Sequence, residues 1–72
     1  MEITEHAEQR MEERNISRLD VEHVIATAHT RTAQPWGTTL HHGIALDDRA
    51  IVVCTESEDW DVIVTIYRPD EV

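Results

Sequence analysis

Residues 16–21, Ile-Ser-Arg-Leu-Asp-Val, decide how the first half of the chain folds. Ser17 is a preferred N-cap residue, and Asp20 stands three positions later, where its carboxylate can return a hydrogen bond to the cap. Ile16 and Val21 flank this cap and can pack on each other as a hydrophobic staple. The pattern predicts that a helix begins at Ser17.

Apolar residues continue from this cap at helical spacing. They stand at i, i+3, i+4 and i+7 and predict a core-facing helix over residues 17–29: Val21, Val24, Ile25 and Ala28. Before the cap, Thr4 can begin another helix, over residues 4–15, with Ala7 and Met11 as a narrow apolar stripe. The short joint near Asn15 then makes the two helices a hairpin.

After residues 35–37, Pro-Trp-Gly, the apolar period changes to two, which is typical of strands. Three strands separated by short turns over residues 38–68 predict an antiparallel meander, and residues 1–4 can add an edge strand. We therefore predict one α+β domain over residues 1–72, with the helical hairpin packed on one face of a three- to four-stranded antiparallel sheet.

The same patterns predict which side chains form the core. In the last strand, the set Trp60, Val62, Val64 and Ile66 is assigned to the face beneath the helices. The full predicted core is Ala7, Met11, Leu19, Val21, Val24, Ile25, Leu40, Ile44, Val62, Val64 and Ile66.

The charge of the chain is strongly negative. Fifteen Asp and Glu stand against six Arg and no Lys, for a net charge of −9. Such a protein is repelled by a nucleic-acid backbone, so any nucleic-acid activity needs a local arginine site. The excess of acid fits an ordinary solvated surface or adaptation to high salt, where screening removes the self-repulsion.

Other sequence signals are weak. No apolar stretch is long enough to span a membrane and no secretory pattern appears, so we expect a cytoplasmic protein without membrane contact. The five histidines lack metal-ligand spacing, and the adjacent His41 and His42 would point to opposite faces of a strand. Cys54 is expected to be a small buried residue. We predict no metal and no cofactor.

His6, Arg10 and Arg14 follow one another at intervals of four and share one ridge of the first predicted helix. A neutral His near a helix N-terminus can act as a base, and guanidinium groups can hold a phosphate through two hydrogen bonds. A structural alternative stays open, in which the arginines pair with Glu13, Asp20 or the acidic C-terminus.

The opening residues 3–17, together with Asp20-Val21 and residues 64–69, Val-Thr-Ile-Tyr-Arg-Pro, resemble the small domain of unknown function 4258 family. The pattern of that family is roughly H-A-x-x-R-M-x-x-R-x-I, followed by a helix and by strands ending in V-T-V-Y. Residues 26–49 match only in kind. The resemblance implies a similarity to RelE/ParE-type toxins and barnase-like ribonucleases, although those toxins are basic.

On that analogy, the candidate catalytic residues are the His-Arg-Arg set of the first helix and two residues at the end of the last strand, together forming an anion or RNA pocket: His6, Arg10, Arg14, Thr65 and Tyr67. In a metal-independent ribonuclease, His6 would be general acid or base, the arginines would stabilise the phosphorane, and Tyr67 would position or protonate.

The competing hypothesis is a non-catalytic interaction domain. In that case the arginine ridge is structural, and the acidic surface recognises a partner, either a second copy of the chain or a basic protein. The net negative charge of the chain favours this hypothesis. RNA would be a partner only under the ribonuclease alternative.

Overall fold

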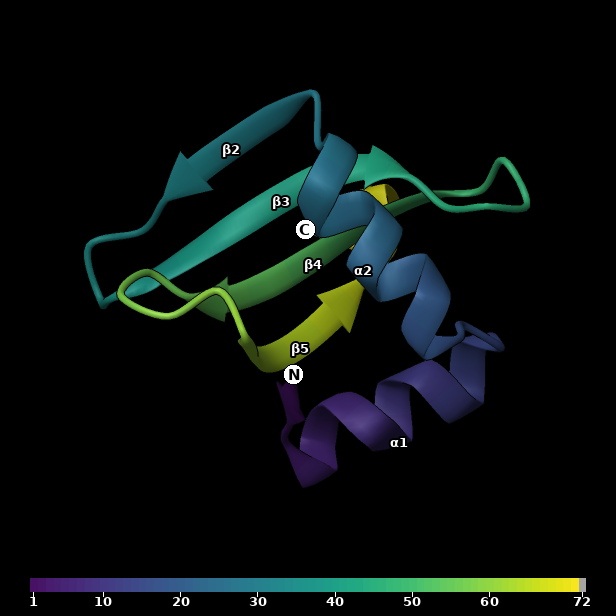
Figure 1. Cartoon of the computed structure of the whole chain (residues 1–72), viewed down its shortest axis with the longest axis horizontal. Helices are drawn as coiled ribbons and strands as arrows, with labels where there is room; N and C mark the ends of the chain where they lie inside the picture. Colours follow the sequence, from purple (N-terminus) through teal and green to yellow (C-terminus); the bar gives the residue numbers. More distant parts are fainter. Residues whose placement is uncertain (72) are drawn as a thin grey trace.

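A computed structural model describes residues 1–71 and shows two helices and a five-stranded sheet (Figure 1). In chain order the elements are β1 (Glu2–Ile3), α1 (Glu5–Arg14), α2 (Arg18–Thr27), β2 (Thr30–Ala33), β3 (Thr38–Ile44), β4 (Ala50–Glu56), β5 (Val62–Tyr67) and the 3₁₀ turn η1 (Pro69–Glu71). The α+β class is confirmed.

The helical hairpin forms as its caps predict. Thr4 accepts the backbone N–H of Ala7 at 3.1 Å, and Ser17 and Asp20 form a complete capping box. Between the helices Asn15 adopts a left-handed conformation, with φ of 53°, which turns the chain sharply. Ile16 and Val21 are both buried in the core, as a hydrophobic staple requires.

The sheet is larger than predicted and is mixed. Its order is β1-β5-β4-β3-β2, and β1 lies parallel to β5 while the other neighbours are antiparallel. The edge strand at residues 1–4 is therefore confirmed, but the expectation of a purely antiparallel sheet of three or four strands is wrong. The missed strand is β2, whose four residues, Thr-Arg-Thr-Ala, are all exposed at the sheet edge and so show no apolar alternation.

The predicted helix-facing side of β3 is wrong by one residue. His41, Gly43 and Ala45 lie under the helices, whereas Leu40 belongs to a second buried cluster and Ile44 is exposed. The cause is the close approach of α2, because a Cβ on Gly43 would lie 3.1 Å from Val24 Cγ1. Gly43 and the small Ala45 therefore leave room for α2 at this end of the strand.

In β5 a bulge breaks the alternation that the sequence suggests. Partners change from Cys54↔Thr65 to Thr55↔Ile63, which leaves Val64 as the extra residue. As a result Ile63 and Ile66 share the helix-facing core, and Val64 packs in the second cluster. The predicted core positions of Val62 and Val64 are thus wrong, and Ile63 was missed.

Of the remaining core predictions, some are confirmed and some are wrong. Ala7, Val21 and Val24 are fully buried beside Ile66, and Met11 and Ile25 pack against them. Leu19 is 64% exposed and Trp60 42% exposed, so neither is a core residue.

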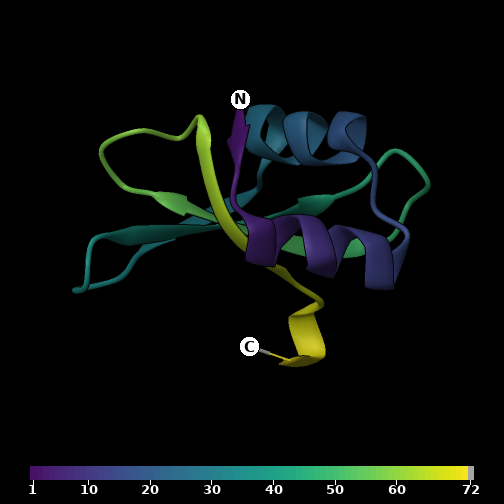
Figure 2. The same ribbon diagram turned by 90° about the horizontal axis from the view of Figure 1, so that it is seen from below.

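The two faces of the sheet are covered differently. Figure 2 shows α2 on one side of the sheet and η1 on the other. The side opposite α2 has its own small buried cluster, formed by Leu40, Val52 and Cys54, with Val64 and Tyr67 packed on it. Within residues 1–71 no helix has the length and hydropathy needed to span a membrane.

Candidate functional site

The five residues of the predicted anion site do not converge. His6 is exposed on α1, and Arg10 makes only a loose ion pair with Glu13 at 3.8 Å. Tyr67 packs on the cluster opposite α2, and the hydroxyl of Thr65 is buried without a hydrogen-bond partner. Within residues 1–71 no hydrogen bond or ion pair joins any two of His6, Arg10, Arg14, Thr65 and Tyr67.

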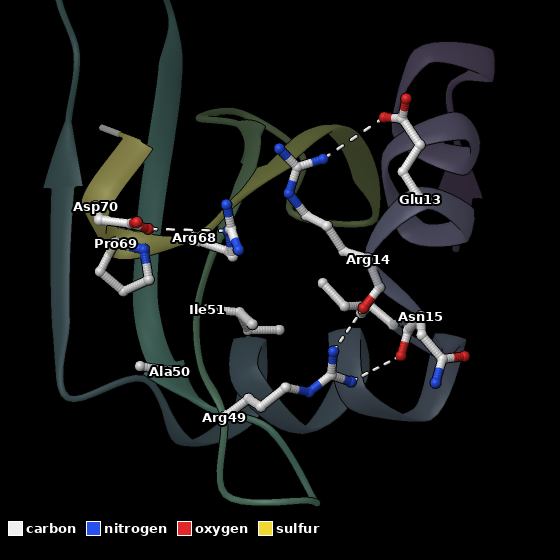
Figure 3. A pocket seen from close by; sticks show the side chains of 10 residues that line it. Glu13, Arg14, Asn15, Arg49, Ala50, Ile51, Arg68, Pro69 and Asp70 are labelled. Atoms are coloured by element: carbon white, nitrogen blue, oxygen red, sulfur yellow. Dashed lines mark hydrogen bonds and ion pairs between the residues drawn. The ribbon is translucent and has the colours of Figure 1, made fainter.

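Arg14 is the member of that set that lines a pocket. This pocket, here called the arginine pocket, has a volume of about 540 Å³ and brings Arg14 together with Arg49 and Arg68 (Figure 3). It lies between the end of α1, the start of β4 and η1. Three of the six arginines of the chain therefore meet at one place.

Arg49 closes the end of α1. Its guanidinium donates to the carbonyl oxygens of Arg14 at 2.5 Å and Asn15 at 2.7 Å, and its Nε donates to Asp47 at 2.6 Å. The last carbonyls of a helix lack partners within the helix and carry partial negative charge, so a cation there is stabilising. Arg49 is thus a structural cap that ties the β3–β4 turn to α1 (Figure 3).

Arg14 and Arg68 share one carboxylate, that of Glu71 in η1. Arg14 donates from Nε to Oε1 at 3.2 Å and from Nη2 to Oε2 at 2.5 Å, while Arg68 Nε donates to Oε1 at 2.8 Å. Hydrogen bonds from Arg14 and then from Arg68 lower the pKa of Glu71. The carboxylate therefore stays ionised and is shared by both guanidinium groups.

All six arginines contact another part of the same chain. Besides those already described, Arg18 donates to the carbonyl of Met1 at 3.4 Å, and Arg31 donates to that of Ile25 at 2.8 Å. By contrast, ten acidic side chains are exposed and have no ion-pair partner within residues 1–71: Glu2, Glu5, Glu8, Glu12, Glu22, Asp48, Glu56, Glu58, Asp59 and Asp61. The charge that faces solvent is therefore mainly negative.

A second group of polar residues surrounds the buried His41. Arg31 Nε donates to His41 Nδ1 at 3.2 Å, and because arginine has no acceptor, the proton of the neutral ring must lie on Nε2, which donates to Thr55 at 2.8 Å. Burial first, and then the charge of Arg31, lower the pKa of His41 to about 4. His41 is therefore a neutral structural residue near pH 7.

Trp60 covers this histidine and remains half exposed on its outer side. Its ring meets the His41 ring edge-on at a centroid distance of 4.7 Å, and the Arg31 guanidinium lies 5.0 Å from its centroid. Beside it is a pocket of about 290 Å³, here called the Trp60 pocket, lined by Met1, Glu22, Ile25, Ala26, Trp60 and Asp61. It combines apolar walls with two carboxylates.

A family model described as Domain of unknown function (DUF4258) matches residues 3–68. The chain belongs to this family. No curated protein and no solved structure matches the chain. The family membership expected from residues 3–17 and 64–69 is thus confirmed.

Sequence reasoning missed most of the residues that line the two pockets of this family member. Arg49 stands in an Asp-Asp-Arg turn and Arg68 follows the last strand, and neither has a periodic relation to Arg14. Two signals were available, because Glu13 and the acidic C-terminus were both named as alternative partners of the arginines. Arg14 lies 3.6 Å from Glu13 and 2.5 Å from Glu71, which confirms both pairings. Trp60 was assigned to the core, so its neighbours Glu22 and Asp61 were not recognised.

Proposed function

We propose that this domain is a non-catalytic interaction module that binds a basic segment of another protein. The observation that supports it best is the unequal use of charge. Every arginine is engaged within the chain, whereas ten carboxylates are exposed and unpaired within residues 1–71. Such a surface attracts cationic partners, speeds their encounter and repels polyanions.

The Trp60 pocket offers a place for one basic side chain of the partner. The methylene groups of a lysine or arginine can lie along its apolar wall, formed by Met1, Ile25, Ala26 and Trp60, while the cation reaches Glu22 and Asp61. At the rim of such a pocket, a partly desolvated cation gains more from two carboxylates than it would in open solvent. The pocket thus adds a specific contact to the diffuse acidic field.

The ribonuclease alternative has less support. It needs His6 and the guanidinium groups around one phosphate, but His6 lies in the first turn of α1, whereas Arg14 lines the arginine pocket at the other end of this helix. Tyr67 packs on the cluster opposite α2. General acid-base catalysis requires groups within hydrogen-bond reach of the same substrate. Cleavage of RNA by the purified protein that depends on His6 would restore this alternative.

The proposal is tested by measuring the binding of an arginine-rich peptide with titration calorimetry at low salt. The double variant Glu22→Gln/Asp61→Asn should weaken binding roughly tenfold, which corresponds to about 1.4 kcal/mol. The control is Asp48→Asn, which also removes an exposed carboxylate and keeps a side chain that tolerates the φ of 71° found there. Asp48 lies in the β3–β4 turn, and the Trp60 pocket lies beside the β4–β5 turn, at the other end of the sheet (Figure 1).

Three results would contradict the proposal. Equal losses in Asp48→Asn and in the double variant would exclude the Trp60 pocket as the contact. Absence of any saturable binding at low salt would exclude a basic partner. A mass of two chains in light scattering, with no peptide binding, would favour the homodimer instead.

A further inference from the structure

The Glu71 carboxylate binds two of the arginines that line the arginine pocket, in the way that a bound oxyanion would. Arg14 holds it through two parallel hydrogen bonds, at 3.2 and 2.5 Å, and Arg68 adds a third at 2.8 Å. Guanidinium groups recognise carboxylate and phosphate with this same forked geometry. The two guanidinium groups are therefore oriented for an oxyanion, and a carboxylate of the same protein engages them.

The donors in this pocket are unequal in rigidity. Arg14 is only 15% exposed, and its position at the end of α1 is fixed by Arg49, which binds the carbonyl oxygens beside it. By contrast, Arg68 is 61% exposed, and η1, which holds Glu71, has no buried residue. Arg14 is thus held rigidly, whereas the segment that carries Glu71 is held mainly by exposed ion pairs, which are weak.

The pocket is also larger than a carboxylate needs. Its volume of about 540 Å³ lies in the range of small-molecule sites, and Ile16, Ala50, Ile51 and Pro69 give it apolar walls. Two carboxylates also line it, those of Glu13 and Asp70, which lie 3.6 Å from Arg14 and 3.9 Å from Arg68. A ligand that fits it has an anionic head for the guanidinium groups and a compact apolar body. Ten exposed carboxylates would repel a nucleic-acid polymer, but they oppose a single small anion much less.

We propose that the arginine pocket binds a small phosphomonoester, whose phosphate displaces the Glu71 carboxylate from Arg14 and Arg68. A phosphate dianion carries more charge than a carboxylate and offers three acceptor oxygens, so it can bind Arg14 and Arg68 together. This site is separate from the Trp60 pocket, and it does not depend on the proposed binding of a basic partner.

This site is tested by titrating the protein with phenyl phosphate and with inorganic phosphate. The amide NMR signals of residues 14, 49 and 68 report the binding. Glu71→Gln should tighten binding of phenyl phosphate roughly five- to tenfold, the factor expected if Glu71 fills the site in about 80–90% of molecules. Asp48→Asn removes the same charge elsewhere and should leave the affinity unchanged. Inorganic phosphate should bind more weakly because it cannot use the apolar walls.

Arg68→Gln provides the complementary test, because this exposed side chain can be replaced without disturbing the core. In the Glu71→Gln background it should weaken binding of phenyl phosphate. The proposal is overturned if Glu71→Gln and Asp48→Asn change the affinity equally, or if Glu71→Gln shows no saturable shift at the three arginines.

Discussion

At the scale of single residues, His41 shows how the sheet uses a polar side chain as part of its core. It is fully buried, yet both ring nitrogens are satisfied, by Arg31 and Thr55, and Trp60 covers its edge. Nothing in the sequence distinguishes this histidine from His42, which lies on the opposite face of β3. The structural role depends on Thr55 and Trp60, which lie 14 and 19 positions away along the chain.

This environment predicts a specific pH dependence of stability. The pKa of His41 is about 4 in the folded protein and about 6.5 in the unfolded chain, so the unfolded state binds the proton more tightly. Stability is therefore complete above pH 6.5 and falls by at most about 3 kcal/mol as the pH drops from 6.5 to 4. Urea unfolding across this range measures the loss.

His41→Gln is the control, because it removes the titrating group and keeps hydrogen-bonding capacity. Its stability should change less than that of the parent protein between pH 6.5 and 5, above the range in which carboxylates titrate. Parallel pH curves for the two proteins would exclude His41 as the cause.

At the scale of elements, the caps were predictable and the strand faces were not. A cap depends on residues three positions apart, so Thr4 and Ser17 locate both helices to within two residues. Strand faces depend on neighbours far along the chain. The bulge in β5 and the close contact of α2 with Gly43 each shift a face by one residue, which local alternation cannot reveal.

The bulge predicts which side chains of β5 stabilise the fold. Ile63→Ala should reduce the free energy of unfolding by about 2–5 kcal/mol, because Ile63 is fully buried under the helices. Val62→Ala removes a half-buried side chain and should cost less than about 1 kcal/mol. Urea unfolding of the two variants measures the difference, and a larger loss in Val62→Ala would mean that the strand face is assigned wrongly.

At the scale of the whole molecule, little of the arginine pocket could be predicted from the sequence. The predicted site comprised His6, Arg10, Arg14, Thr65 and Tyr67, and of these five residues Arg14 is the one that lines the pocket. Arg49 and Arg68 join it through the β3–β4 turn and the end of β5, so the pocket exists only in the folded chain. The Trp60 pocket likewise joins distant parts of the chain. Met1 precedes β1, the residues 22, 25 and 26 lie in α2, and Trp60 and Asp61 precede β5.

The unpaired carboxylates predict that salt stabilises the protein. Screening reduces their mutual repulsion, so raising KCl from about 0.05 to 1 M should increase stability by about 1 kcal/mol and the melting temperature by roughly 4–8 °C. In Glu8→Gln/Glu12→Gln, which removes a like-charge pair four residues apart on α1, the increase should be smaller. A flat salt series for the parent protein would favour an ordinary acidic surface over adaptation to high salt.

Binding of a basic side chain beside Trp60 can be followed by NMR while an arginine-rich peptide is added, through the indole N–H signal of Trp60 and the amide signals of Glu22 and Asp61. We expect these signals to show the largest saturable shifts, and the amide signal of Asp48, at the other end of the sheet, to shift little. Shifts spread evenly over all exposed acidic residues, or largest away from Trp60, would contradict this proposal.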